Sequence, residues 1–119
     1  MKLSKLLIAA AAAFSGAVMV IPSAHAISIY NPGTESCGSW TAAQDSVPRG
    51  LKVAWLVGFV SGYNWYRPGE DVTSDPHGLV AWVDNYCLAN PLDLIARAAG
   101  RLVDGLRRQR GLVPTMRPN

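Results

Sequence analysis

His77 is the side chain best suited to catalysis or metal binding near neutral pH, because histidine titrates there and ligates metals. A zinc site also needs thiolates or carboxylates close by, and the sequence places no such set around His77. A Ser-His-Asp arrangement with Ser61 or Ser74 has no motif that would hold the three residues together. No phosphate-binding glycine loop or cofactor fingerprint occurs in the sequence. We therefore predict a protein that has no catalytic residues, metal or cofactor and is not an enzyme.

Three carboxylates, Glu70, Asp71 and Asp75, fall in one short stretch of the chain. Such clusters can do acid–base work or bind calcium. These three lack the spacing of an EF-hand loop and its closing glutamate. Asp75 precedes a proline, the order of residue types found where a helix begins. We therefore expect a solvated loop that ends in a helix cap.

Large aromatic residues are a second candidate feature, since the chain has four tryptophans. Trp65 and Tyr66 come at the end of the most apolar segment that follows residue 26, and Trp82 lies in the helix expected over residues 76–89. Exposed aromatic side chains are frequent at protein-binding surfaces. We take these three as candidate binding residues, with plain core packing as the alternative.

The first 26 residues have the three regions of a secretory signal peptide. Lys2 and Lys5 precede an uncharged apolar run of about 16 residues, and Ala24 and Ala26 then form an A-x-A cleavage site. An uncleaved membrane anchor is the alternative, but the run is shorter than the roughly 20 residues that span a bilayer. We expect cleavage after Ala26 and a periplasmic or secreted mature chain, with no stable membrane span.

The two cysteines, Cys37 and Cys87, allow a single pairing. In an exported protein an even cysteine count indicates a disulfide. The alternative, a reactive thiol pair, lacks a Cys-x-x-Cys motif. Closing a loop of about 50 residues stabilises a fold by up to about 4 kcal/mol, which matters for a domain with a small core.

Charge is distributed unevenly along the expected mature chain. Residues 27–96 hold three basic and seven acidic residues, whereas residues 97–119 hold six arginines and one acid. The negative charge of the first part and the positive charge of the second nearly cancel. So small a net charge argues against a nucleic-acid partner for an exported protein. The basic end has two interpretations, contact with an acidic partner or a solvated helix face and tail.

The most apolar mature segment, Leu51 to Trp65, predicts a central helix that is buried on most sides. Trp55 and Tyr63 fall at helical spacing within it. Gly58 and Gly62 lie one turn apart and form a small-xxx-small pair, which lets a neighbouring backbone approach closely. We expect helix packing at these four residues, with a loose turn at the glycines as the alternative.

Further helices are expected over residues 36–44, 76–89 and 91–109, with a loop at 46–50. Asn90 before Pro91 repeats the pattern of Asp75 before Pro76, a capping residue followed by proline, and predicts the start of the last helix. Leu92 is expected on the buried face of that helix. Gly111 ends that helix, and a disordered tail is expected over 111–119. The sequence thus predicts an all-α domain over residues 27–110, a bundle of about four helices with one disulfide.

Four short motifs follow one another in an order typical of a known family. The first is Cys37 followed by Trp40, and the second is Trp55, Gly58 and Gly62-Tyr63 in the central helix. The third is Asp71-Val72, and the fourth runs from Tyr86-Cys87 to Asn90-Pro91. Over about residues 36–106 this order resembles the HdeA-like small periplasmic proteins. The resemblance implies a helical fold with one disulfide. The best-known members of that family are acid-stress chaperones, which are dimers at neutral pH and bind unfolding periplasmic proteins when acidified.

For this chain the resemblance implies a homodimer and unfolded periplasmic proteins as clients. Four acidic residues, Glu70, Asp71, Asp75 and Asp84, are the expected pH-responsive groups. Their protonation near about pH 4 removes negative charge and leaves the arginines unbalanced, which would loosen the bundle or the dimer.

A second resemblance covers only the last expected helix. The A-x-x-L-V-x-x-L run from Ala99 to Leu106 is similar to the closing part of immunity proteins that neutralise type VI secretion effectors in the periplasm. That resemblance implies an inhibitor that binds one periplasm-targeted toxin. Both interpretations describe an exported binding protein.

Overall fold

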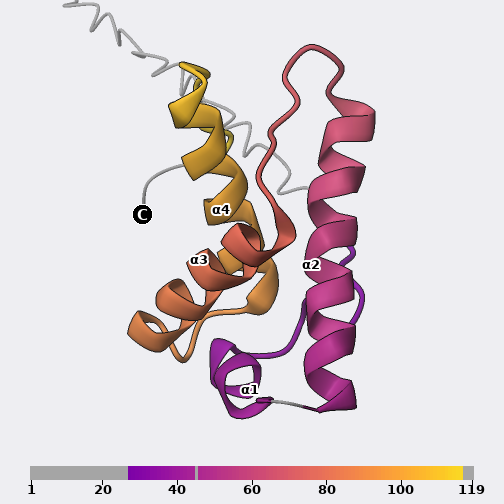
Figure 1. Cartoon of the computed structure of the whole chain (residues 1–119), viewed down its shortest axis with the longest axis vertical. Helices are drawn as coiled ribbons and strands as arrows, with labels where there is room; N and C mark the ends of the chain where they lie inside the picture. The colour runs from indigo at the N-terminus through magenta and orange to yellow at the C-terminus, as the bar shows by residue number, and fades with distance from the viewer. Residues whose placement is uncertain (1–26, 45, 117–119) are drawn as a thin grey trace, which may run out of the picture.

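The computed structural model describes residues 27–44 and 46–116, which form a bundle of four helices (Figure 1). The helices are α1 (Cys37–Ala42), α2 (Val47–Tyr66), α3 (Pro76–Ala89) and α4 (Ile95–Gln109). Within these ranges there is no strand, only an isolated antiparallel bridge between Ser36 and Leu94. The predicted all-α bundle is therefore confirmed. The expected signal peptide, residues 1–26, lies outside the described residues.

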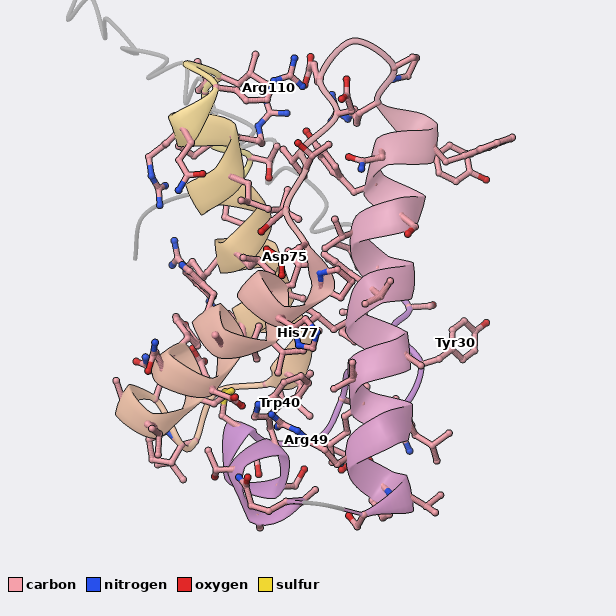
Figure 2. The ribbon with its side chains drawn as sticks, in the orientation of Figure 1. Tyr30, Trp40, Arg49, Asp75, His77 and Arg110 are labelled. Carbon is pink, nitrogen blue, oxygen red and sulfur yellow. A yellow bond between two sulfur atoms is a disulfide. The ribbon has the colours of Figure 1, made fainter. Side chains whose placement is uncertain are left out.

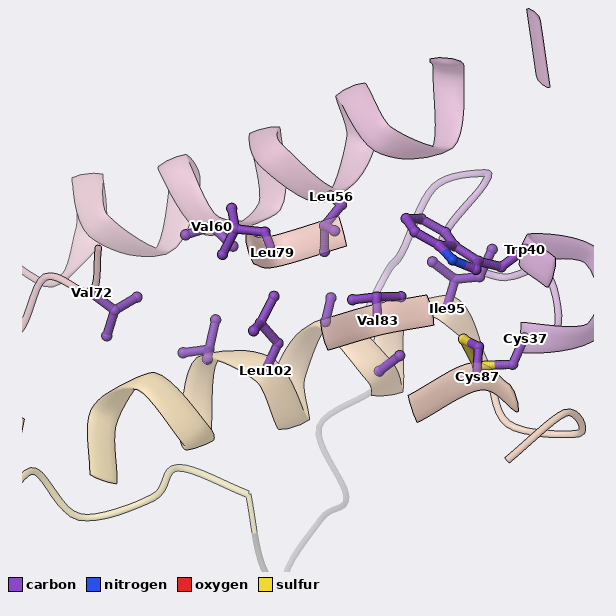
Figure 3. Close-up of a cluster of buried hydrophobic side chains, with 13 residues drawn as sticks. Cys37, Trp40, Leu56, Val60, Val72, Leu79, Val83, Cys87, Ile95 and Leu102 are labelled. Carbon is purple, nitrogen blue, oxygen red and sulfur yellow. A yellow bond between two sulfur atoms is a disulfide. The ribbon is translucent and has the colours of Figure 1, made fainter. Parts of the chain in front are cut away.

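The predicted disulfide between Cys37 and Cys87 is present and joins the start of α1 to the end of α3 (Figure 3). The core lies between α2 and the α3–α4 pair, with the disulfide at its α1 end. Trp40 is fully buried beside the disulfide and is the largest side chain in the core. One long-range covalent bond and one tryptophan thus fix the short α1 to the rest of the bundle.

The central helix α2 begins at Val47, four residues earlier than predicted. The expected loop over 46–50 was inferred from Pro48, which instead occupies the first turn of α2. Proline is well tolerated there because the first amides of a helix have no partner within the helix. The prediction of a loop was therefore wrong.

The start of α3 agrees with the sequence. Asp75 is the N-cap, and its side chain accepts a hydrogen bond of 3.0 Å from the amide of Gly78. Pro76 is the first helical residue. This cap ends the loop after α2 and sets the direction in which α3 returns along the bundle.

The start of α4 differs from the prediction, because Asn90 ends α3 and the helix begins only at Ile95. The amides of Ile95 and Ala96 donate hydrogen bonds of 2.9 Å to the carbonyls of Glu35 and Gly33. The lead-in to α1 therefore caps α4, a long-range contact that a local cap rule does not reveal. Leu92, predicted on the buried face, is 93% exposed in the turn between the two helices.

Gly111 ends α4 with a φ of 76°, as predicted for a glycine at this position. A disordered tail was expected over 111–119, but the structure places its first residues, up to Met116, against α4. Arg107 Nε donates to the carbonyl of Val113 at 2.7 Å, and the amides of Thr115 and Met116 donate to Asp104. Residues 112–116 thus return along the helix, and we call them the C-terminal strap.

Candidate protein-binding site

The side of α2 that faces away from the other helices carries no charge. Figure 1 shows α2 on one side of the bundle, with α1, α3 and α4 together on the other. Its exposed residues follow helical spacing along one side and form what we call the α2 outer face: Val47, Pro48, Gly50, Leu51, Ala54, Gly58, Ser61, Gly62, Trp65 and Tyr66. A contiguous apolar surface of this kind is typical of a protein-binding site.

Two of the three predicted binding aromatics belong to this face. Trp65 and Tyr66 are each 81% exposed at the end of α2. Trp82 instead packs against the core, and its ring stacks on Tyr86 with the centroids 5.4 Å apart. Trp82 is therefore not part of the α2 outer face, and for this residue the alternative of core packing applies.

The glycine pair of α2 also lies on the outer face. A Cβ atom added to Gly58 or Gly62 would meet no other atom within 4 Å. No backbone of the described chain therefore packs against the pair, contrary to the prediction of close helix packing within the fold. Trp55 and Tyr63, predicted with them, do pack against the core from the other side of α2.

Both charged residues of α2 point inward. Lys52 is only 5% exposed, and its ammonium group binds the Glu35 carboxylate and, at 3.3 Å, the hydroxyl of Ser39. The sequence indicated neither the burial of Lys52 nor its partner, because Glu35 lies in the lead-in before α1. This ion pair ties that lead-in to the first half of α2.

The second inward charge, Arg49, joins three helices. Its Nη2 atom lies 2.7 Å from Asp84 Oδ1, and its guanidinium stacks over the Trp40 ring at 4.6 Å (Figure 2). The same Asp84 oxygen accepts a 2.7 Å hydrogen bond from Trp40 Nε1. Asp84, predicted as a pH-responsive group, thus satisfies a buried indole and a half-buried cation together.

The remaining predicted acids lie at separate places. Glu70 accepts a 2.6 Å hydrogen bond from Arg107, which lowers the pKa of the Glu70 carboxyl below its ordinary value. Arg107 also binds the hydroxyl of Tyr63, so it links α2, the α2–α3 loop and α4. Asp71 makes an exposed 3.3 Å ion pair with Arg110, while Asp75 caps α3. These acids therefore form no single cluster, and each holds a different contact.

Asp104 is a buried acid that was not among the candidate residues expected from the sequence. It is 1% exposed and accepts hydrogen bonds from the C-terminal strap. Burial alone would raise the pKa of its carboxyl, but the bonds from Thr115 and Met116, with the nearby Arg108, lower it overall. Its apolar neighbours Leu102 and Val103 gave no signal that a chain segment would return to this position.

An apolar pocket of about 630 Å³ lies next to the strap. Its wall comes from the N-terminal segment 27–30, from α2 through Trp55 and Phe59, from the first half of α4, and from Thr115 and Met116 of the strap. The polar side chain of Arg97 stands at this pocket, paired with Asp93 at 3.2 Å. The pocket is thus an apolar hollow between the inner side of α2, the first half of α4 and the two terminal segments, separate from the α2 outer face.

His77 lies exposed in the first turn of α3 (Figure 2). Within residues 27–44 and 46–116 no three His, Cys, Asp or Glu side chains are grouped as a metal site would need. No helix in the same ranges is long and apolar enough to cross a membrane. The features that stand out in the described chain are therefore apolar surfaces and the ion pairs behind them.

In comparisons with known proteins, no family model, no curated protein and no solved structure matches this chain significantly.

Proposed function

We propose that this chain is an exported, non-enzymatic binding protein that acts as an HdeA-like acid-stress chaperone in the periplasm. The observation that carries the proposal is the α2 outer face, an uncharged helix surface on which Trp65 and Tyr66 are 81% exposed. Unfolding proteins expose apolar segments, and an apolar helix face binds such segments without requiring a particular sequence.

The ion pairs behind this face support an acid response. Glu35 with Lys52, Asp84 with Arg49, and Glu70 with Arg107 each connect segments far apart in the chain. The pKa of both Glu35 and Glu70 is lowered by the hydrogen bonds of these pairs. The stabilising effect of the Glu35 and Glu70 pairs is therefore present at neutral pH and lost as the pH falls through their lowered pKa values. Acid loosens the bundle in this way and enlarges the apolar surface that a client can contact.

At neutral pH we propose that the α2 outer faces of two copies cover each other. Four aromatic side chains, Trp65 and Tyr66 from both copies, would remove about 500–800 Å² of surface from water. Specific complexes bury about 1,200–2,000 Å² in total, so the other exposed residues of the two α2 outer faces would supply the remainder. The face carries no charge, so two copies meet without repulsion between like charges.

The test is aggregation of an acid-sensitive client enzyme, followed by light scattering at about pH 2–3 with and without the protein. We expect a several-fold excess of the mature chain to suppress aggregation. A wild-type protein that leaves the scattering unchanged at this excess would disprove the chaperone function.

Matched variants locate the activity. Leu51→Ser and Trp65→Ser alter the α2 outer face and should weaken suppression. Leu92→Ser alters an apolar side chain that is even more exposed, in the turn between α3 and α4, and it should leave suppression unchanged. Equal loss in all three variants would mean that general surface hydrophobicity, and not this face, binds the client.

A second candidate function is that of an inhibitor of one periplasm-targeted toxin. It is favoured by Trp65 and Tyr66, which stand exposed on a folded helix at neutral pH and need no acid to be reached. It predicts a tight 1:1 complex in a pull-down from periplasmic extract at neutral pH, weakened by Trp65→Ser. A chaperone predicts weak binding to many proteins in the same experiment, and only after acidification.

A further inference from the structure

The C-terminal strap is held mainly by one buried side chain. Asp104 accepts hydrogen bonds from the Thr115 amide at 2.6 Å, the Thr115 hydroxyl at 2.8 Å and the Met116 amide at 2.9 Å. Arg107 adds two bonds: its Nε donates to the carbonyl of Val113 at 2.7 Å, and its carbonyl accepts from the Leu112 amide at 2.9 Å. Both carboxylate oxygens of Asp104 therefore bind the strap, although Asp104 itself belongs to α4.

The charge of Asp104 and the position of the strap depend on each other. A carboxylate that is 1% exposed is unfavourable unless hydrogen bonds replace its lost water. The strap supplies these bonds from uncharged donors. Among the described residues the charged group that acts on Asp104 is Arg108, one turn further along α4, which attracts it without a direct ion pair. The guanidinium of Arg107 is already shared between Glu70 and the strap carbonyl.

The strap covers apolar surface. The sulfur of Met116 lies so close to α4 that a Cβ atom on Gly100 would be 2.6 Å from it. Thr115 and Met116 line the pocket of about 630 Å³, together with Trp55 and Phe59 of α2. Removing the strap would therefore widen this pocket and expose the surface around Gly100.

We propose that the C-terminal strap is an acid-released cover, and that an extended apolar segment of another protein takes its place when Asp104 is protonated. The strap indicates the occupant, because it is itself an irregular segment held by backbone amides and one methionine side chain. The proposal rests on the chaperone function and adds a second client-binding surface to the α2 outer face.

The direction of the pH response follows from Asp104. Its pKa is lowered overall in the folded protein, so the strap stays attached at neutral and mildly acidic pH. It is released as the pH falls through that lowered value, where the carboxyl group becomes neutral and loses its strength as an acceptor. The cover therefore opens at a lower pH than that at which an ordinary aspartate is protonated.

The experiment measures 1-anilinonaphthalene-8-sulfonate fluorescence against pH for the mature chain with its disulfide intact, with helix content followed by circular dichroism. Wild type should bind little dye at pH 7 and several-fold more in acid while its helices persist. Asp104→Asn, and separately a chain truncated after Val113, should bind several-fold more dye at pH 7 and show a smaller acid step than wild type. A residual step remains because both variants keep the Glu35–Lys52 and Glu70–Arg107 pairs, which acid also loosens. Asp71→Asn, which alters an exposed pair with Arg110, is the control and should follow wild type.

The two variants keep the test decisive even if one of them fails to fold. Unchanged dye binding at pH 7 in the truncated chain would overturn the cover, and an unchanged acid step in Asp104→Asn would overturn its trigger.

The occupant is tested with a labelled, reduced and alkylated client polypeptide, whose fluorescence anisotropy at pH 7 should rise with the truncated chain and not with wild type. Equal anisotropy would exclude this surface as a client site, whereas loss of aggregation suppression by wild type would reject the chaperone function itself.

Discussion

The buried ammonium group of Lys52 offers a sharp test of how this fold uses charge. We consider Glu35→Gln, which keeps the shape of the side chain but removes the charge that balances Lys52. Lys52 is 5% exposed, and its other polar contact is the hydroxyl of Ser39 at 3.3 Å. The variant therefore leaves a cation in the core without an anion.

The expected loss of stability follows from the exposure of the two partners. Breaking a fully buried ion pair from one side costs about 3–5 kcal/mol. The side chain of Glu35 is 38% exposed, so water screens part of the attraction, and we expect a loss of about 2 kcal/mol for Glu35→Gln. Lys52→Met removes the buried charge itself and leaves Glu35 hydrated, so its effect should stay within about 1 kcal/mol. On the Lys52→Met background, Glu35→Gln should cost no more than about 0.5 kcal/mol.

Urea unfolding of the four proteins, with the disulfide intact, measures this cycle at pH 7 and again at about pH 3. The hydrogen bond from Lys52 lowers the pKa of Glu35, followed by the bond from Ser39. The stabilisation by Glu35 is therefore complete above its unfolded pKa and falls as the pH drops through the lowered folded value, so the difference between wild type and Glu35→Gln should shrink in acid. Asp71→Asn, which alters a surface pair, should change stability by less than about 0.5 kcal/mol. Equal losses for Glu35→Gln with and without Lys52→Met would refute the reasoning, because the two residues would then not be coupled.

Three further predictions concern the framework. Replacing Cys37 and Cys87 together by alanine should lower the free energy of unfolding by about 4 kcal/mol, since the bond spans 50 residues, and thermal melts of the variant against wild type measure the loss. Asp75→Ala removes the 3.0 Å cap of α3 and should cost about 1 kcal/mol in urea unfolding, while Asp75→Ser should recover most of it. Gly33→Ala places a Cβ atom against the Trp55 ring and should cost about 1–3 kcal/mol with a change in tryptophan fluorescence, and an unaltered melt would show that the turn adapts.

Local signals in the sequence predicted the elements whose ends are set locally. Asp75 before Pro76 and Gly111 after α4 act through bonds within one turn, and both positions agree with the structure. The start of α4 depends instead on the carbonyls of Gly33 and Glu35, which lie about 60 residues earlier in the chain. Pattern rules that use neighbouring residues cannot detect such a cap.

The candidate site was predictable in the same partial way. Exposure at the end of a helix was one of two interpretations for Trp65 and Tyr66, with core packing as the other, and the structure places both side chains on the surface. The strap was not expected, because Asp104 fits a surface pair with Arg108 by helical spacing alone. Its burial arises from a segment after Gly111 that has the composition of a loose tail. The partners of buried charges are thus the part of this site that the sequence conceals.

The two cations of α2 explain why its outer face has no charge. Arg49 and Lys52 are three residues apart and so lie on the same side of the helix, where Asp84 and Glu35 neutralise them. An ordinary surface helix has the reverse arrangement, with charges toward water and apolar residues toward the core. Because both cations lie on the inner side of α2, acids from two other segments must neutralise them and the outer side is left apolar. An exposed apolar side of this kind favours association with other molecules. The inward ion pairs and the uncharged outer face therefore fit the binding function proposed above, in which another protein surface covers α2.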